Sequence, residues 1–146
     1  MNIYLASKSS QTKCVIELAE LLKKSGHILT IEWWKLPLCK SVSVANDHEW
    51  FSHQYMRSVC ERDFKAIERA DILIIVADDE ETVFNGANVE LGYALALGKT
   101  CMSIGKLTRC AMYARVIMFS SIQDLMDNLN IFDNAFDNQT YRKGES

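Results

Sequence analysis

The sequence predicts a single-domain α/β fold, a doubly wound, flavodoxin- or Rossmann-like five-stranded parallel sheet with helices on both faces. One reason is that short apolar runs alternate along the chain with segments of helical periodicity. Another is the run Ile-Leu-Ile-Ile-Val-Ala at residues 72–77, because a strand that is apolar on both faces suits the centre of a parallel sheet. The length, 146 residues, is that of one domain with a sizeable core. We expect the domain over residues 1–130 and a polar C-terminal tail over 131–146.

Each expected element follows from its periodicity and from the residues at its ends. The elements, in order, are strand 3–6, helix 11–25, strand 27–34, helix 47–70, strand 72–77, helix 87–97, strands 100–104 and 115–119, and helix 121–129. Helix 11–25 has apolar residues at positions i, i+3, i+4 and i+7 and stops at Gly26. Pro37 ends the second strand, and the pairs Asn46-Asp47 and Ser120-Ser121 are candidate caps for two later helices.

Composition argues against several classes of function. Lys and Arg number 16 against 19 Asp and Glu, a net charge of −3, so we expect no nucleic-acid partner. No apolar run approaches the roughly 20 residues of a membrane span, and the N-terminus does not read as a secretory signal. We therefore expect no membrane partner and a cytoplasmic location. The five cysteines form no CxxC pair and are expected to be reduced. His48 and His53 are five residues apart, unlike the histidines of HExxH, so we expect no metal and no cofactor.

Ligands of doubly wound sheets bind outside the carboxyl ends of the strands, and several familiar nucleotide signatures are missing from these loops. The sequence has no GxGxxG after the first strand, no GxxxxGK[ST], and no Gly- and Thr-rich loop of the FMN type. Asp78-Asp79 follow the central strand, as the phosphoacceptor does in a receiver domain. The loop after the first strand has no acidic residue that would hold the magnesium of such a domain.

Two carboxylates interrupt the apolar faces of predicted helices. Asp63 lies on the apolar stripe of its helix, seven residues after Met56, and Glu90 lies on an inner face between Ala87 and Ala94. Carboxylates are rarely buried unless paired, and the ordinary explanation is a capping or ion-pairing role. The positions favour a function instead, because the dipole at a helix N-terminus favours an ionised Glu90. An ionised carboxylate beside an apolar wall can attack an oxocarbenium-like sugar carbon, while a second one orients substrate or passes a proton.

The sequence around these carboxylates resembles the nucleoside 2-deoxyribosyltransferase family, which includes the 2′-deoxynucleoside 5′-monophosphate N-glycosidases. The resemblance rests on Asp63-Phe-Lys-Ala-Ile-Glu-Arg-Ala-Asp71-Ile-Leu-Ile-Ile-Val-Ala and on Gly86-Ala-Asn-Val-Glu90-Leu-Gly92-Tyr93-Ala-Leu-Ala-Leu-Gly98-Lys99. It implies that Glu90 is the nucleophile at the anomeric carbon and that Asp63 contacts the base or assists its departure. It also implies that Gly86 keeps a turn open at the sugar, that Gly92 permits close helix–sheet packing, and that Tyr93 is a packing residue. A homodimer or higher homo-oligomer is expected with it.

Other residues are candidates for substrate binding. The first loop offers backbone N–H groups, hydroxyls and one ammonium at a helix N-terminus, from Ser7, Lys8 and Ser9. The resemblance implies a 5′-phosphate site there; a plain N-cap is the alternative. Trp33 and Trp34 end the second strand and are expected to face opposite sides, so that Trp33 stacks on a base, or both are structural.

One position departs from the family pattern. The family commonly has Asp, or Ser in the monophosphate hydrolases, six residues before the nucleophile, and this chain has Phe84 there. Asn85, Asn88 or Asp79 are the candidates to contact the sugar in its place. The departure bears on sugar specificity and on catalysis itself.

The sequence therefore favours an enzyme that cleaves or transfers the N-glycosidic bond of a (deoxy)nucleoside or its 5′-monophosphate. Its expected partner is that small molecule. Two alternatives stay open. TIR-like domains of similar architecture cleave NAD with a comparably placed Glu, although their Trp-Cys-x-x-Glu pattern is absent before Glu90. A nucleotide-binding sensor or interaction protein without catalysis is the other alternative, and Phe84 is its main argument.

Overall fold

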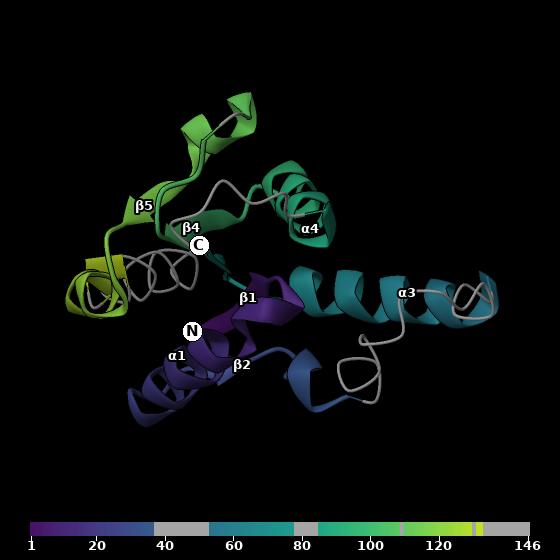
Figure 1. The fold of residues 1–146 in the computed structure, drawn as a ribbon, viewed down its shortest axis with the longest axis horizontal. Coiled ribbons are helices and arrows are strands. Elements are labelled where there is room, and N and C mark those ends of the chain that lie inside the picture. Colours follow the sequence, from purple (N-terminus) through teal and green to yellow (C-terminus); the bar gives the residue numbers. More distant parts are fainter. Residues whose placement is uncertain (37–52, 78–84, 109, 130, 133–146) are drawn as a thin grey trace, which may run out of the picture.

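The centre of the protein is a parallel sheet, which the computed structural model shows in the order β2-β1-β3-β4-β5 (Figure 1). The structure describes residues 1–36, 53–77, 85–108, 110–129 and 131–132. Within them the strands are β1 (Asn2–Ser7), β2 (Ile28–Leu29), β3 (Ile72–Val76), β4 (Thr100–Ile104) and β5 (Ile117–Phe119), and every pairing is parallel. This is the flavodoxin-like order, with its switch point between β1 and β3. The predicted fold class is confirmed.

Helices cover both faces of the sheet, as expected for parallel strands joined by crossovers. The helices and 3-10 turns with printed bounds are α1 (Thr12–Lys24), α3 (His53–Arg69), α4 (Asn85–Ala96), η1 (Ser9–Gln11), η2 (Trp33–Lys35) and η4 (Ala111–Arg115). Residues 122–129 are also helical. Figure 1 shows α1 on one side of the sheet and α3 with α4 on the other. No helix in the described ranges is long and apolar enough to cross a membrane.

The side chains of β1 alternate between the two faces of the sheet and so enter two different cores. Ile3 and Leu5 join the core under α1 and the helix at 122–129. Tyr4 and Ala6 join the core under α3 and α4. Tyr4 is fully buried there, with 1% of its surface exposed. A phenol therefore lies on the same face of the sheet as the helices that carry the two predicted catalytic carboxylates.

Several predicted ends are confirmed. The buried stripe of α1 is the predicted one, Val15, Leu18, Ala19 and Leu22. Gly26, just beyond the end of this helix, has a φ of 87°, a backbone conformation that glycine adopts at little cost. The Ser121 hydroxyl accepts the N–H of Asp124 at 3.1 Å, so it caps the last helix. The cap expected at Asn46-Asp47 lies outside the described residues, as does most of the expected tail, residues 133–146.

The second strand is much shorter than the predicted 27–34. It pairs with β1 at two positions, after which Trp33–Lys35 turn into η2. The Ile3 carbonyl accepts the Thr30 N–H at 3.0 Å, and the next carbonyl on this edge, that of Leu5, accepts the Trp33 indole N–H at 2.7 Å. A side chain thus takes the bond that a longer strand would have made. For this reason the prediction that Trp33 and its neighbour alternate along a strand is wrong.

Candidate active site

The candidate site lies where β1 and β3 end side by side. Ser7 and Val76 are paired at the carboxyl ends of these strands, and the Ser7 hydroxyl donates to the Val76 carbonyl at 2.8 Å. The chain leaves β1 through η1 into α1. The segment after β3 leads to α4, which begins at Asn85. The switch point of the sheet is therefore next to the helices that carry Asp63 and Glu90.

Glu90 lies on α4 beside the face that packs on the sheet. Its neighbours Ala87, Leu91 and Ala94 are buried in the core that contains Tyr4. The Tyr4 hydroxyl donates a hydrogen bond to the Glu90 carboxylate, whose side chain is partly buried. Burial raises the pKa of Glu90 to about 7, the Asp63 charge also raises it, and the Tyr4 hydrogen bond acts against both. The carboxylate is therefore poised to change charge near neutral pH.

The helix dipole does not keep Glu90 ionised, contrary to the expectation from sequence. Glu90 is the sixth residue of α4, counted from Asn85. The favourable effect of a helix N-terminus on a carboxylate falls off within the first turn. Burial decides the direction of the pKa shift instead. The nucleophilic form depends on the hydrogen bond from Tyr4 more than on the helix.

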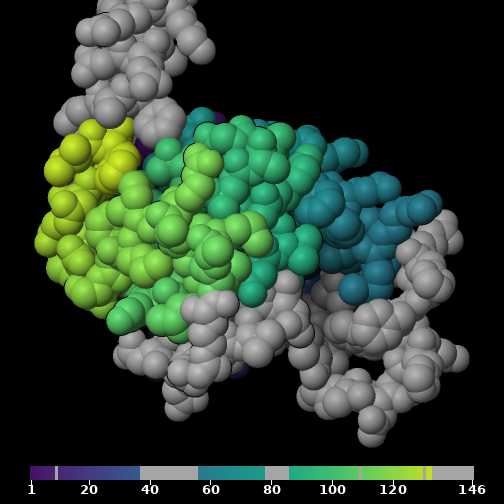
Figure 2. All heavy atoms as spheres, turned by 90° about the horizontal axis from the view of Figure 1, so that it is seen from above, coloured from purple at the N-terminus to yellow at the C-terminus, as the bar shows by residue number. Residues whose placement is uncertain are grey.

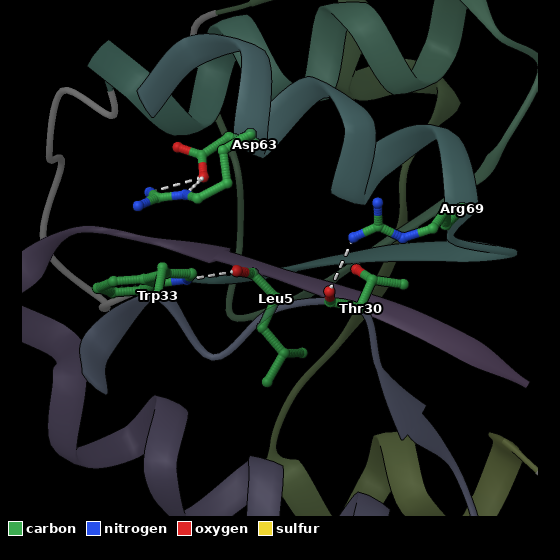
Figure 3. A network of polar contacts seen from close by, with 6 residues as sticks. Leu5, Thr30, Trp33, Asp63 and Arg69 are labelled. Carbon is green, nitrogen blue, oxygen red and sulfur yellow. Dashed lines mark hydrogen bonds and ion pairs between the residues drawn. The ribbon is translucent and has the colours of Figure 1, made fainter. Parts of the chain in front are cut away.

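Asp63 lies on α3 with 17% of its side chain exposed. Its neighbours Ala66 and Ile67 are fully buried against the sheet, which places this part of α3 over the same core as α4. The Arg62 guanidinium donates to Asp63 Oδ1 from Nε at 3.0 Å and from Nη2 at 2.8 Å (Figure 3). Burial raises the pKa of Asp63, and the hydrogen bonds and charge of Arg62 oppose the rise.

Tyr4 is a site residue that the sequence analysis missed. Its pKa is raised well above the ordinary range because the phenol is buried and because Glu90 and Asp63 carry negative charge nearby. It therefore stays a hydrogen-bond donor to the carboxylate at every physiological pH. The signal available in the sequence was alternation along the first strand, since a phenol at the second position of Ile-Tyr-Leu-Ala must face one of the two helical layers.

Contacts between α3 and α4 continue beyond the two carboxylates. The rings of Phe64 and Tyr93 stack with centroids 4.3 Å apart. The Tyr93 hydroxyl donates to Glu68 Oε1 at 2.7 Å, and Lys99 Nζ donates to the Glu68 carbonyl at 2.8 Å. Tyr93 is thus the packing residue that was expected. The row of contacts fixes the two helices relative to each other, and with them the carboxylates of Asp63 and Glu90.

Trp33 lies at the carboxyl end of β1 through its indole hydrogen bond to the Leu5 carbonyl (Figure 3). It meets Trp34 edge to face with ring centroids 5.5 Å apart, and Trp34 is buried in the core under α1. The ring of Trp33 is only partly buried. Its position and partial exposure suit the predicted contact with a base, and that role stays a prediction.

Asn88 faces a different side of α4 from Glu90, because residues two apart on a helix do not share a face. Its Oδ1 accepts the Tyr113 hydroxyl of η4 at 2.7 Å. In the space-filling view of Figure 2, α4 lies between α3 and the segment that follows β4. The structure therefore places Asn88 on the side of that segment. Its predicted contact with substrate stays a prediction.

The two glycines singled out on α4 have open space around them. A Cβ added at Gly86 or at Gly92 would meet no atom within 4 Å, apart from near neighbours in the chain and helix backbone. The expected close packing at Gly92 is therefore wrong, because a Cβ at this position would not touch the sheet. Gly86 is exposed in the first turn of α4 rather than in a turn before it.

The loop after β1 carries the residues that were predicted to bind a phosphate, and some of their polar groups are bonded within the protein. The Ser7 hydroxyl proton is engaged by β3, and the Lys8 carbonyl accepts the Gln11 N–H at 3.0 Å to close η1. The residue that precedes α1 is Gln11 rather than one of the serines. Ser9 starts η1, and Asn85 starts α4. Phe84 and Asp79 lie outside the described residues.

Among the described residues, no three His, Cys, Asp or Glu side chains gather into a group that could hold a metal ion. The described cysteines, Cys14, Cys60, Cys101 and Cys110, are free. Burial raises the pKa of Cys101 to about 11, so this thiol is not a nucleophile near neutral pH.

Comparison with known proteins identifies the class. The family model for nucleoside 2-deoxyribosyltransferases matches residues 3–130, so the chain belongs to this family. The fold is similar to that of the CMP N-glycosidase BcmB of Clostridium botulinum, at 16% identity and a TM-score of 0.57 over 89% of this chain and 99% of that chain. It is also similar to the fold of a 2-deoxyribosyltransferase of Bacillus psychrosaccharolyticus, at 22% identity and a TM-score of 0.65, over 86% of this chain and 90% of that chain. No curated protein sequence matches the chain significantly. Family membership supports an enzyme that acts at the N-glycosidic bond of nucleosides or nucleotides.

Proposed function

We propose that this protein cleaves or transfers the N-glycosidic bond of a (deoxy)nucleoside or its 5′-monophosphate, with Glu90 as the nucleophile. The observation that carries the proposal is the contact of Tyr4 with Glu90 beside Asp63, over the switch point of the sheet. A structural carboxylate would be expected to pair with a cation. Here the hydrogen-bond partner of Glu90 is the phenol of Tyr4, which orients the carboxylate without neutralising it.

The proposed reaction has two steps. In the first, the ionised Glu90 carboxylate attacks C1′, the C1′–N bond breaks, and its electron pair leaves with the base. Asp63 assists this departure by contact with the base or by giving it a proton. In the second step, water attacks C1′ of the glycosyl-enzyme, a proton is released, and the Glu90 carboxylate is regenerated. A second base in place of water would give transfer instead of hydrolysis.

Further residues would hold the substrate. We assign the base to the exposed edge of Trp33, and a 5′-phosphate, where present, to the loop of Ser7, Lys8 and Ser9. Asn85, Gly86 and Asn88 are the candidates on α4 for the sugar side. The similar structures include a CMP N-glycosidase and a 2-deoxyribosyltransferase, so ribose, deoxyribose and monophosphate forms all belong among the candidate substrates. The homodimer expected from the family stays a prediction, and light scattering of the purified protein would test it.

The test is a base-release assay. The protein is incubated with deoxynucleosides, deoxynucleotides, ribonucleotides and NAD, and the free base is measured by chromatography, with Glu90→Gln as the control. We expect release from a nucleoside or nucleotide that Glu90→Gln abolishes. Release from NAD alone would favour the TIR-like reaction. Binding without release across the panel, by a folded protein, would refute the enzyme and favour the sensor.

A further inference from the structure

Among the described residues, Arg62 is the positively charged side chain that interacts with the carboxylates of the candidate site. Its Nε and Nη2 both donate to Asp63 Oδ1, at 3.0 and 2.8 Å. Its side chain is 34% exposed and that of Asp63 is 17% exposed, so the pair is partly shielded from water. The same guanidinium acts electrostatically on Glu90 and on Tyr4. Arg62 is therefore coupled to each acidic group of the site.

The geometry of this contact is specific. Adjacent residues on a helix point about 100° apart, so a contact between positions i and i+1 is not given by helix geometry alone. Here two donors of the guanidinium meet a single carboxylate oxygen. Because an aspartate has two side-chain torsions, holding Oδ1 also fixes the direction of Oδ2. Arg62 leaves Oδ2 to another partner.

We propose that Arg62 is a positioning residue for the proposed reaction: it holds Asp63 by Oδ1, so that Oδ2 acts on the departing base. The inference rests on the proposed function for the role of Asp63. It adds a residue that acts through Asp63 and that need not touch the substrate. A solvent-exposed ion pair would contribute little. The partial burial of both partners and the two charge-assisted hydrogen bonds hold this pair in a more definite geometry than an exposed ion pair would have.

The charge of Arg62 also affects the pH at which the site works. The titratable groups that face Asp63 from the packed elements are Glu90 of α4 and Tyr4 of β1, with Arg62 on the same helix. Arg62 lowers the pKa of Asp63 and that of Glu90, against the effect of burial. Loss of this charge would make both carboxyl groups hold their protons to higher pH. The whole pH profile would then move to the alkaline side.

The test compares two variants. Arg62→Gln removes the positive charge and the two guanidinium donors, whereas Arg62→Lys keeps a positive charge but loses the paired Nε and Nη2 donors. Arg69→Gln is the matched control, since Arg69 lies on the same helix and donates to the Thr30 carbonyl at 3.2 Å (Figure 3). For Arg62→Gln we expect kcat to fall about tenfold and the pH midpoint of kcat/KM to rise. For Arg62→Lys we expect a similar fall in kcat with the midpoint near its original value. Arg69→Gln should change neither.

Two further readouts distinguish this proposal from its alternatives. In an Asp63→Asn background, Arg62→Gln should lower kcat less than twofold further, since Arg62 acts through Asp63. If the two losses multiply, Arg62 acts independently and the proposal is overturned.

The carboxyl carbons of Asp63 and Glu90 are also titrated by NMR without substrate, assigned with Asp63→Asn and Glu90→Gln. If the pKa values of Asp63 and Glu90 are the same in Arg62→Gln as in the wild-type protein, the proposal is overturned even if no substrate is found. If these pKa values are higher in Arg62→Gln but the wild-type protein releases no base, the proposed function alone is refuted. If Arg62→Gln does not fold, wild-type kcat in Arg62→Lys would still overturn the positioning role.

Discussion

The Glu90→Gln variant should become more stable than the wild-type protein as the pH rises. Burial raises the pKa of Glu90 from an ordinary 4.5 to about 7. Between these two values the folded state binds a proton that the unfolded state has released, so stability falls as the pH rises through this range. The 2.5-unit difference corresponds to about 3 kcal/mol at pH 8. Glutamine does not ionise, so the variant avoids this loss and can still accept the Tyr4 hydroxyl.

The assay is urea unfolding of both proteins at several pH values from 4 to 8. The difference in unfolding free energy, variant minus wild type, should rise by up to about 3 kcal/mol across this range. Glu68→Gln is the matched control, because Glu68 also accepts a tyrosine hydroxyl but lies exposed on the surface. Parallel pH profiles for wild type and Glu90→Gln would refute the conclusion that burial controls this carboxylate. Such a result would also weaken the case for a nucleophile that titrates near neutral pH.

Two other pairs of variants test the electrostatics of the site and the geometry of a turn. Tyr4→Phe should raise the pKa of Glu90 and Asp63→Asn should lower it, because the first removes a hydrogen bond to the ionised form and the second removes a like charge. NMR titration of the Glu90 carboxyl would measure both, and shifts of the same sign would contradict the assignment. Gly105→Ala should cost more stability than Gly26→Ala, by about 1 kcal/mol in thermal unfolding, although both glycines have a φ of 87°. Only at Gly105 would the new Cβ meet a backbone oxygen, at 3.1 Å, so equal losses would refute the steric argument.

The main elements of the fold could be predicted because their signals are local. The run at 72–77 predicts a strand buried on both faces, and every residue of β3 is buried. The periodicity of residues 11–25 predicts α1 and its buried stripe. The second strand could not be bounded in this way. Its length is decided by the indole of Trp33, which takes the Leu5 carbonyl, and that bond joins segments 28 residues apart.

The carboxylates of the site could be predicted, but their environment could not. Asp63 and Glu90 stand out because each is a charged residue on an apolar helix face. Tyr4 does not stand out, since an aromatic residue in a strand is ordinary. The raised pKa of Glu90 follows from burial and from groups on two other elements, Tyr4 of β1 and Asp63 of α3, and no local pattern in the sequence reports this environment. The dipole argument from sequence was wrong for the same reason.

The charge balance of the site is the strongest physical argument for the proposed chemistry. Two carboxylates, Asp63 and Glu90, and the phenol of Tyr4 interact there. Among the described residues, Arg62 is the cation that acts on these groups, and it is hydrogen-bonded to Asp63. An ionised Glu90 is therefore hydrogen-bonded to the neutral Tyr4, and the Arg62 charge offsets only part of the cost of burying its charge in the free protein. A glycosidic carbon that gains positive charge as its bond to the base breaks would supply a further counter-charge. Because that charge exists in the transition state and not in the neutral substrate, the interaction would lower the barrier more than it strengthens binding.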